Sequence, residues 1–221
     1  PEYISALSQD VVNLDNIEII NHGIDFEKFY KIPIKSEEKF MLSVGALKYR
    51  KGYHISIPAF AEVKKELPDL KYKIVGSQKD TVYFNELKNL AAQYRVEKDI
   101  EFLTDLNDEG LSNLYRRAKL FILTSVNENH HFEGFGLVFL EAAAACLPVI
   151  GTLGNGIEDA VKNGHNGLLV PQDDIGATIS AIVKIIKDEK IRNEFSYNSF
   201  EWARDHDWSE VILKYLKVYM R

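Results

Sequence analysis

The stretch that most constrains the fold covers residues 118–152, AKLFILTSVNENHHFEGFGLVFLEAAAACLPVIGT. Its pattern predicts a strand over 120–123, a polar loop over 126–132, a helix over 137–146 and a second strand that starts at Pro148. A short apolar run without polar alternation is typical of a strand that is buried on both faces, as in parallel sheets. Because open α/β sheets bind ligands at the carboxyl ends of their strands, the polar loop is the first place to expect a site.

Two carboxylates, Glu133 and Glu141, frame the turn into this helix. Four backbone amides would lie at the helix start: those of Gly134, Phe135, Gly136 and Leu137. Several of these amides would have no acceptor within the helix, so the turn could bind an anion. Glu141 falls on an apolar helix face and needs a hydrogen-bond donor, from the protein or from ligand hydroxyls. Two plainer alternatives stay open: Glu133 as an exposed loop acid, and Glu141 as a helix glutamate bonded to nearby backbone or an arginine.

A cluster of cations follows the first long strand, which is predicted over 40–45. After Gly45 the chain reads ALKYRKG, so Lys48, Arg50 and Lys51 lie between the end of a strand and the start of a helix. Cations in that place could neutralise a diphosphate. On spacing alone, a solvated basic loop explains them equally well.

Further strands alternate with helices along the rest of the chain. Strands are predicted at about 40–45, 70–75, 100–103, 120–124, 148–151 and 167–170. Such alternation predicts an α/β fold with a doubly wound parallel sheet, which is Rossmann-like.

Bulk properties narrow the class of partner and compartment. The formal net charge is -6, which argues against a nucleic-acid partner, because such partners usually require a basic face. The single Cys146 cannot form an internal disulfide, and the sequence carries no signal peptide or membrane-spanning run, so we expect a cytoplasmic protein. The chain starts at Pro1 rather than Met, and we expect that it belongs to a longer protein.

The segment 133–150, EGFGLVFLEAAAACLPVI, resembles the donor-binding loop of retaining nucleotide-sugar glycosyltransferases of the GT-B fold (glycosyl transferases group 1 type). That family carries E-x-FG-x-x-x-x-E-A-x-A-x-G-x-PV-I at this place. The segments 45–52, 111–118 and 166–171 resemble its G-R-L...K-G, L-x-x-L-Y-x-x-A and N-G-L-L-V-P motifs. The resemblance covers nearly the whole chain, but only as the C-terminal, donor-binding half of such an enzyme.

Two positions depart from the motifs of the family. Ala46 stands where the family has an arginine that grips the donor pyrophosphate together with the lysine matched by Lys51. Lys48 or Arg50 is then the candidate substitute for that arginine, and the departure bears on catalytic competence. Cys146 stands where the family usually has glycine, behind the expected site, and we expect only a change in packing there.

The resemblance implies a nucleoside-diphosphate sugar donor and transfer to a hydroxyl acceptor with retained configuration, without a cofactor or a bound metal. Glu133 would orient the sugar hydroxyls and Lys51 would stabilise the departing diphosphate, so these two are the expected catalytic residues. Glu141 would hold the ribose diol, and Leu106 occupies the place whose backbone reads the base. The remaining donor contacts expected are Gly45, Arg50, Gly134, Phe135, Gly136 and Leu137.

The same resemblance divides the chain. Residues 1–38 would be the remnant of an N-terminal domain and the linker, residues 39–205 the donor-binding domain, and residues 206–221 a helix that returns toward the N-terminal domain. Short strands are predicted at 3–7 and 17–20, with a short helix at 9–14. The acceptor site would lie in the half that is absent here, so we expect this chain alone to bind a donor and transfer no sugar. An acceptor in a membrane would place the protein at the membrane periphery through that absent half.

Other functions were weighed against this one. A non-catalytic nucleotide-sugar-binding module, or a subunit of a glycosyltransferase complex, is the alternative that Ala46 favours. A 2-epimerase of nucleotide sugars shares the fold and stays open. A nicotinamide-binding domain is disfavoured because no G-x-G-x-x-G follows the first long strand. Metal binding by His130 and His131 is disfavoured because no third His or Cys lies at helical spacing from them.

Overall fold

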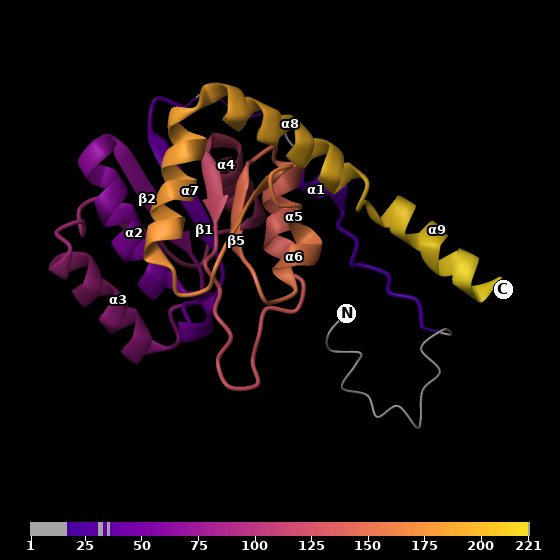
Figure 1. Cartoon of the computed structure of the whole chain (residues 1–221), viewed down its shortest axis with the longest axis horizontal. Helices are drawn as coiled ribbons and strands as arrows, with labels where there is room; N and C mark the ends of the chain where they lie inside the picture. The colour runs from indigo at the N-terminus through magenta and orange to yellow at the C-terminus, as the bar shows by residue number, and fades with distance from the viewer. Residues whose placement is uncertain (1–16, 31–32, 35, 221) are drawn as a thin grey trace.

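The computed structural model describes residues 17–30, 33–34 and 36–220, and these form a six-stranded parallel sheet covered by helices on both faces (Figure 1). The strands are β1 (Lys39–Val44), β2 (Leu70–Val75), β3 (Ile100–Leu103), β4 (Leu120–Ile122), β5 (Val149–Thr152) and β6 (Gly167–Val170). Each lies within two residues of its predicted place, and the α/β doubly wound, Rossmann-like prediction is confirmed.

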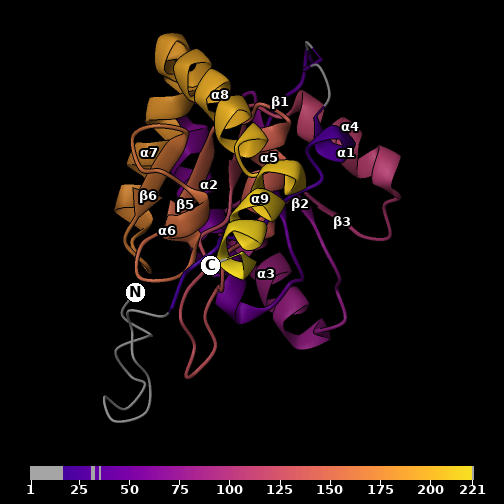
Figure 2. The same ribbon diagram turned by 90° about the vertical axis from the view of Figure 1, so that its right-hand side faces the viewer.

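The helices of the described residues are α1 (Phe26–Phe29), α2 (Tyr53–Glu66), α3 (Thr81–Gln93), α4 (Asp108–Arg117), α5 (Leu137–Ala144), α6 (Ile157–Ala160), α7 (Ile175–Lys187), α8 (Glu189–Arg204) and α9 (Trp208–Tyr219), with a 3-10 turn, η3 (Tyr49–Lys51). Side chains cap several of them. Asp174 accepts from the Ala177 amide at the start of α7, and Asn107 accepts from the Gly110 amide at the start of α4. Figures 1 and 2 show α2 and α7 on one face of the sheet and α4 and α5 on the other.

The strand order, β3-β2-β1-β4-β5-β6, reverses direction between β1 and β4. Met41 of β1 pairs with Leu120 of β4 across this point. The segments that follow the two central strands therefore diverge to opposite faces of the sheet, and doubly wound folds bind their ligands at the carboxyl end of such a point.

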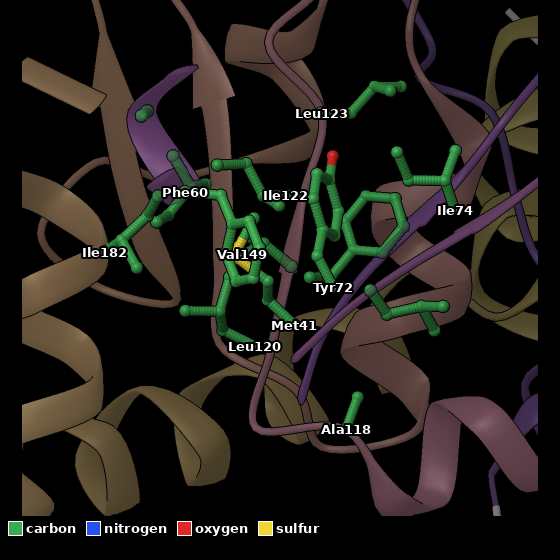
Figure 3. Packing of buried hydrophobic residues seen from close by; sticks show 14 of the residues in the cluster. Met41, Phe60, Tyr72, Ile74, Ala118, Leu120, Ile122, Leu123, Val149 and Ile182 are labelled. Atoms are coloured by element: carbon green, nitrogen blue, oxygen red, sulfur yellow. The ribbon is translucent and has the colours of Figure 1, made fainter. Parts of the chain in front are cut away.

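Apolar side chains fill both faces of the central strands (Figure 3). Met41, Leu120 and Val149 have no exposed surface. Tyr72 is equally buried, and its hydroxyl is satisfied by the hydroxyls of Ser43 at 2.7 Å and Ser56 at 2.9 Å. Continuous burial on both faces explains why these strands read as unbroken apolar runs.

A second, smaller cluster joins α5 to the segment before the sheet. Ala143 and Ala144 of α5 are buried against Phe26 of α1 and Ala203 of α8. Small side chains at these positions let both helices approach α5 closely, which accounts for the alanine run that the sequence shows there.

The segment before α1 is not a strand. The strand predicted over 17–20 is wrong: these residues have no regular structure and Ile17 and Ile19 are exposed. A strand needs a neighbour to pair with, and no strand of the described residues lies beside this segment. The strand predicted over 3–7 and the helix over 9–14 lie outside the described residues. The C-terminal helix, α9, projects from the body in Figure 1.

Ile24 instead joins the chain to the junction between α8 and α9. Its amide donates to the carbonyl of His206 at 2.8 Å, and the amide of Trp208 donates to the Ile24 carbonyl at 3.0 Å. The Trp208 ring lies against Gly23, where any Cβ would collide with it. Among the described helices, none has both the length and the apolar character needed to cross a membrane.

Candidate active site

Opposite charges converge where the loop after β1 meets the loop after β4. The carboxylate oxygen Glu133 Oε2 lies 2.5 Å from Lys51 Nζ and 3.2 Å from Arg50 Nη1. The side chains of Lys51 and Glu133 are only 11% and 12% exposed. The hydroxyl of Ser125 lies 3.4 Å from the same carboxylate oxygen and donates to it. Residues from two distant loops thus form one polar cluster at the place where the strand order reverses.

Glycines allow these loops to touch. Gly52 has φ +71°, and a Cβ on it would lie 1.7 Å from the Thr124 carbonyl oxygen. The Thr124 hydroxyl donates back to the Gly52 carbonyl at 2.7 Å. On the other side, the Gly156 amide donates to the Glu133 carbonyl at 2.9 Å, and a Cβ on Gly156 would lie 1.5 Å from the Gly134 carbonyl oxygen. The position of Glu133 is therefore fixed by backbone contacts on both sides.

The start of α5 presents backbone amides that no side chain caps. Its N-cap is Gly136, whose φ of +78° favours glycine. Gly134 and Leu137 are exposed, whereas Phe135 packs against the core. The helix start therefore adds partial positive charge beside the cations that contact Glu133, and the arrangement suits an anionic ligand.

Glu141 lies one turn further along α5 and has a different environment. The hydroxyl of Tyr115 in α4 donates to Glu141 Oε2 at 2.9 Å. Burial raises the pKa of Glu141, while the Tyr115 hydroxyl and the cation of Lys28 act to lower it. Lys28 in turn pairs with Asp108 at 3.0 Å. Among the described residues, the donor to Glu141 is therefore a tyrosine and not the backbone amide or arginine of the plainer alternative.

The remaining predicted residues follow strands at the carboxyl edge of the sheet. Gly45 follows β1, and a Cβ on it would lie 3.2 Å from the Tyr53 hydroxyl oxygen and in ordinary contact, at 3.6 Å, with Lys51 Cε. Leu106 follows β3 and is 39% exposed. Of the two candidate substitutes for the cation missing at Ala46, the described residues place Arg50 on Glu133 and leave Lys48 exposed.

Aromatic side chains support the cationic turn from its outer side. Tyr49 stacks on His54 with ring centroids 4.1 Å apart, and the hydroxyl of Tyr83 lies 3.0 Å from His54 Nδ1. The Tyr83 hydroxyl also accepts from the His54 amide at 3.3 Å, so Tyr83 holds His54 at two atoms. Burial lowers the pKa of His54, which keeps this ring neutral near pH 7.

His130 and His131 lie at the tip of the loop between β4 and α5. Both are exposed, on a turn closed by two backbone hydrogen bonds of 2.8 Å between Glu128 and His131. Within the described part of the chain, no group of three or more His, Cys, Asp and Glu side chains could hold a metal ion.

Cys146 has φ +60° where α5 ends. This left-handed conformation suits glycine, which gives a backbone reason for the residue that the motif usually has there. The change is therefore one of backbone strain as well as of packing.

The strand order, with charged loops at its reversal point, is that of a Rossmann-like α/β domain. Among such domains, the likeness to solved structures identifies one of GT-B type. The sequence model of the family Glycosyl transferases group 1 matches residues 25–202, and the chain belongs to this family.

Two curated relatives and one solved structure illustrate the likeness. An uncharacterized glycosyltransferase from Methanocaldococcus jannaschii is 27% identical over 94% of this chain and 54% of its own length. Glycogen synthase from Mycobacterium tuberculosis is 29% identical over 94% of this chain and 49% of its own length. HepE from Anabaena, crystallised with UDP and glucose, has a TM-score of 0.78 and 20% identity over 92% of this chain and 56% of that chain. The chain thus spans about half the length of the curated relatives it matches.

Proposed function

We propose that this chain is the donor-binding domain of a retaining glycosyltransferase that uses a nucleoside-diphosphate sugar. The observation that carries the proposal is the contact of Lys51 and Arg50 with Glu133 beside the uncapped start of α5. Family membership and the UDP and glucose bound by HepE support a nucleotide-sugar donor.

The chemistry follows from where charge develops. When the bond between the sugar and the diphosphate breaks, the leaving group gains negative charge, which fixed cations and amides stabilise. Lys51, Arg50 and the amides of Gly136 and Leu137 would receive that charge. Glu133 would turn from the cations to the sugar hydroxyls. Protein groups supply all the positive charge in this scheme, so the proposal includes no cofactor and no metal.

The ribose and base would bind on the other side of the same helix. Glu141 would accept hydrogen bonds from the ribose hydroxyls, and the backbone near Leu106 would meet the base edge. The rest of the reaction, including acceptor binding, is assigned to an N-terminal half that corresponds to the part of the relatives' length outside the match. Without that half the acceptor hydroxyl is not held in line with the sugar carbon, a positioning effect of about 7–11 kcal/mol at best. We expect this chain alone to bind a nucleoside diphosphate with Kd roughly 10 μM to 1 mM and to transfer no sugar.

The first experiment is calorimetry of the chain with UDP, GDP and ADP, repeated with Lys51→Ala and, as a matched control, Lys48→Ala. Both variants remove one lysine charge from the same turn, but only Lys51 contacts the cluster. The proposal predicts binding of at least one nucleotide, weakened by Lys51→Ala and little changed by Lys48→Ala. No binding by any of the three nucleotides would contradict it.

A non-catalytic nucleotide-sugar-binding module is the second candidate, because Ala46 stands in the place of a phosphate-binding arginine. A fusion of this chain to the N-terminal half of a relative separates the two, with labelled donors and sugar or lipid acceptors as substrates. Transfer by the fusion, but not by this chain alone, favours the enzyme. If the fusion binds nucleotide but transfers no sugar, and Ala46→Arg in the fusion restores transfer, the result favours the module.

A further inference from the structure

Tyr115 is fully enclosed, yet its one polar atom points at the expected ribose-binding acid. The side chain is 1% exposed and packs beside Phe121, with ring centroids 6.2 Å apart. Its hydroxyl donates to Glu141 Oε2 at 2.9 Å. Burial, and then the charge of Glu141, raises the pKa of Tyr115 well above its ordinary value. The hydroxyl therefore stays protonated at any physiological pH and is a permanent donor.

This bond occupies only one of the two oxygens of Glu141. Within the described residues, Oε1 takes part in no hydrogen bond or ion pair, and the nearest cation is Lys28, which is paired with Asp108. A carboxylate can accept several hydrogen bonds, so Oε1 keeps its full capacity for ligand hydroxyls. With Oε2 held, the carboxylate plane cannot rotate freely about its last torsion.

We propose that Tyr115 is a positioning residue for nucleotide binding: it fixes Glu141 so that the free oxygen meets the ribose hydroxyls of the donor. This inference rests on the proposed function, since it assigns Glu141 to the ribose. Tyr115 contacts no ligand itself and acts only through Glu141.

The same bond sets the pH range over which Glu141 can accept. Burial favours the protonated carboxyl, and the Tyr115 hydroxyl opposes this by stabilising the carboxylate. The other charged groups that act on Glu141 are Lys28 of α1, which favours the carboxylate, and Asp108 of α4, which disfavours it. Loss of the Tyr115 hydroxyl would therefore raise the pKa of Glu141 further. The fraction of carboxylate, and with it ribose binding, would then fall at a higher pH than in the wild type.

The test compares Tyr115→Phe with Tyr72→Phe, a matched control. Both substitutions remove a buried hydroxyl, but Tyr72 bonds to Ser43 and Ser56 in the core, away from Glu141. Calorimetry with UDP and 2′-deoxy-UDP is run from pH 5.5 to 8.5, or with the GDP or ADP pair if the wild type prefers that base. We expect Tyr115→Phe to weaken ribonucleotide binding about 5- to 10-fold near neutral pH, which is less than the full loss of a hydrogen bond to a charged group because Tyr115 acts only through Glu141. The loss should grow as the pH falls and be smaller for the deoxy analogue.

The outcomes distinguish a failure of the proposed function from a failure of the role assigned to Tyr115. If the wild type binds no nucleotide, the proposed function falls, and this inference with it. If the wild type binds but both Phe variants lose affinity equally, at every pH and for both sugars, Tyr115 is only structural and the inference alone is overturned. Thermal melts of both variants identify a general loss of folding, which would lower Tm in parallel with affinity for every ligand.

Discussion

Glu133 is paired with the cations that a diphosphate would need, so its negative charge should oppose nucleotide binding. Lys51 and Arg50 lie 2.5 Å and 3.2 Å from its Oε2. At an effective dielectric constant of about 20, a unit pair at about 4 Å attracts by roughly 4 kcal/mol before desolvation and ordering are subtracted. A charge-assisted hydrogen bond contributes a net of about 1.5–3 kcal/mol. Because Glu133 regains water when displaced, we expect a ligand to lose about 1–2 kcal/mol of binding free energy in breaking these contacts.

Glu133→Gln should therefore bind a sugar-free nucleoside diphosphate about 5- to 30-fold more tightly than the wild type. The gain should be smaller for a nucleotide sugar, because glutamine is a weaker acceptor for the sugar hydroxyls. Calorimetry with UDP and UDP-glucose, and with the guanosine and adenosine pairs, measures both at 50 mM and 500 mM salt. The gain should largely persist at the higher salt concentration, because the side chains of Lys51 and Glu133 are only 11% and 12% exposed and buried pairs are screened much less than exposed ones.

Glu128→Gln is the matched control for this prediction. It removes the same charge from the same loop, and Glu128 makes no ion pair with either cation. An equal gain in both variants would mean that general loop charge, not contact with the cations, governs affinity. Weaker UDP binding by Glu133→Gln would refute the reasoning outright, since it would show that Glu133 supports the diphosphate rather than competing with it.

Three further predictions follow from the site and the fold. Lys51→Ala should reduce affinity for a diphosphate more than for the monophosphate, as calorimetry would show; equal losses would remove Lys51 from the second phosphate. Glu141→Gln should weaken ribonucleotide binding by about 1.5–3 kcal/mol and leave a deoxyribose analogue nearly unchanged. Because burial raises the pKa of Glu141, the native state holds its proton more tightly than the unfolded chain, and stability falls as the pH rises through that raised value. In thermal melts, the Tm of Glu141→Gln should therefore equal that of the wild type in acid and should increase relative to it as the pH rises. Gly52→Ala should cost more than about 3 kcal/mol in urea unfolding, through its positive φ and its collision with Thr124, whereas Gly164→Ala, with φ +74° and open space, should cost only about 1–2 kcal/mol.

Local pattern was sufficient to predict the sheet. Strands buried on both faces read as continuous apolar runs, and β1 and β2 end within a residue of the predicted places. The exception is the segment 17–20, whose apolar residues satisfy the same pattern without a neighbouring strand. Strand propensity reports side chains suited to a pleated surface, and it cannot show whether a partner exists.

The sequence named candidate residues for the site, but it did not predict their contacts. Lys51, Glu133 and Glu141 stood out because charged residues beside glycines and on apolar faces are unusual. The contact between Arg50 and Glu133 joins positions 83 apart, and no local periodicity encodes such a pairing. Tyr115 was visible only as the tyrosine of the segment that resembles L-x-x-L-Y-x-x-A, and its contact with Glu141 was not predicted, because its hydroxyl is one polar atom on a side chain that packs like an apolar one.

The bridge between Ile24 and Asp207 has a consequence for how this domain can be combined with others. A module whose two ends meet can be inserted into a loop of another polypeptide, or its ends can be joined and new ones opened elsewhere, without stretching the backbone. Residues 24–207 are such a portable module. Different neighbouring domains can be joined at the same junction while the strands, and the charged loops between β1 and β4, keep their geometry.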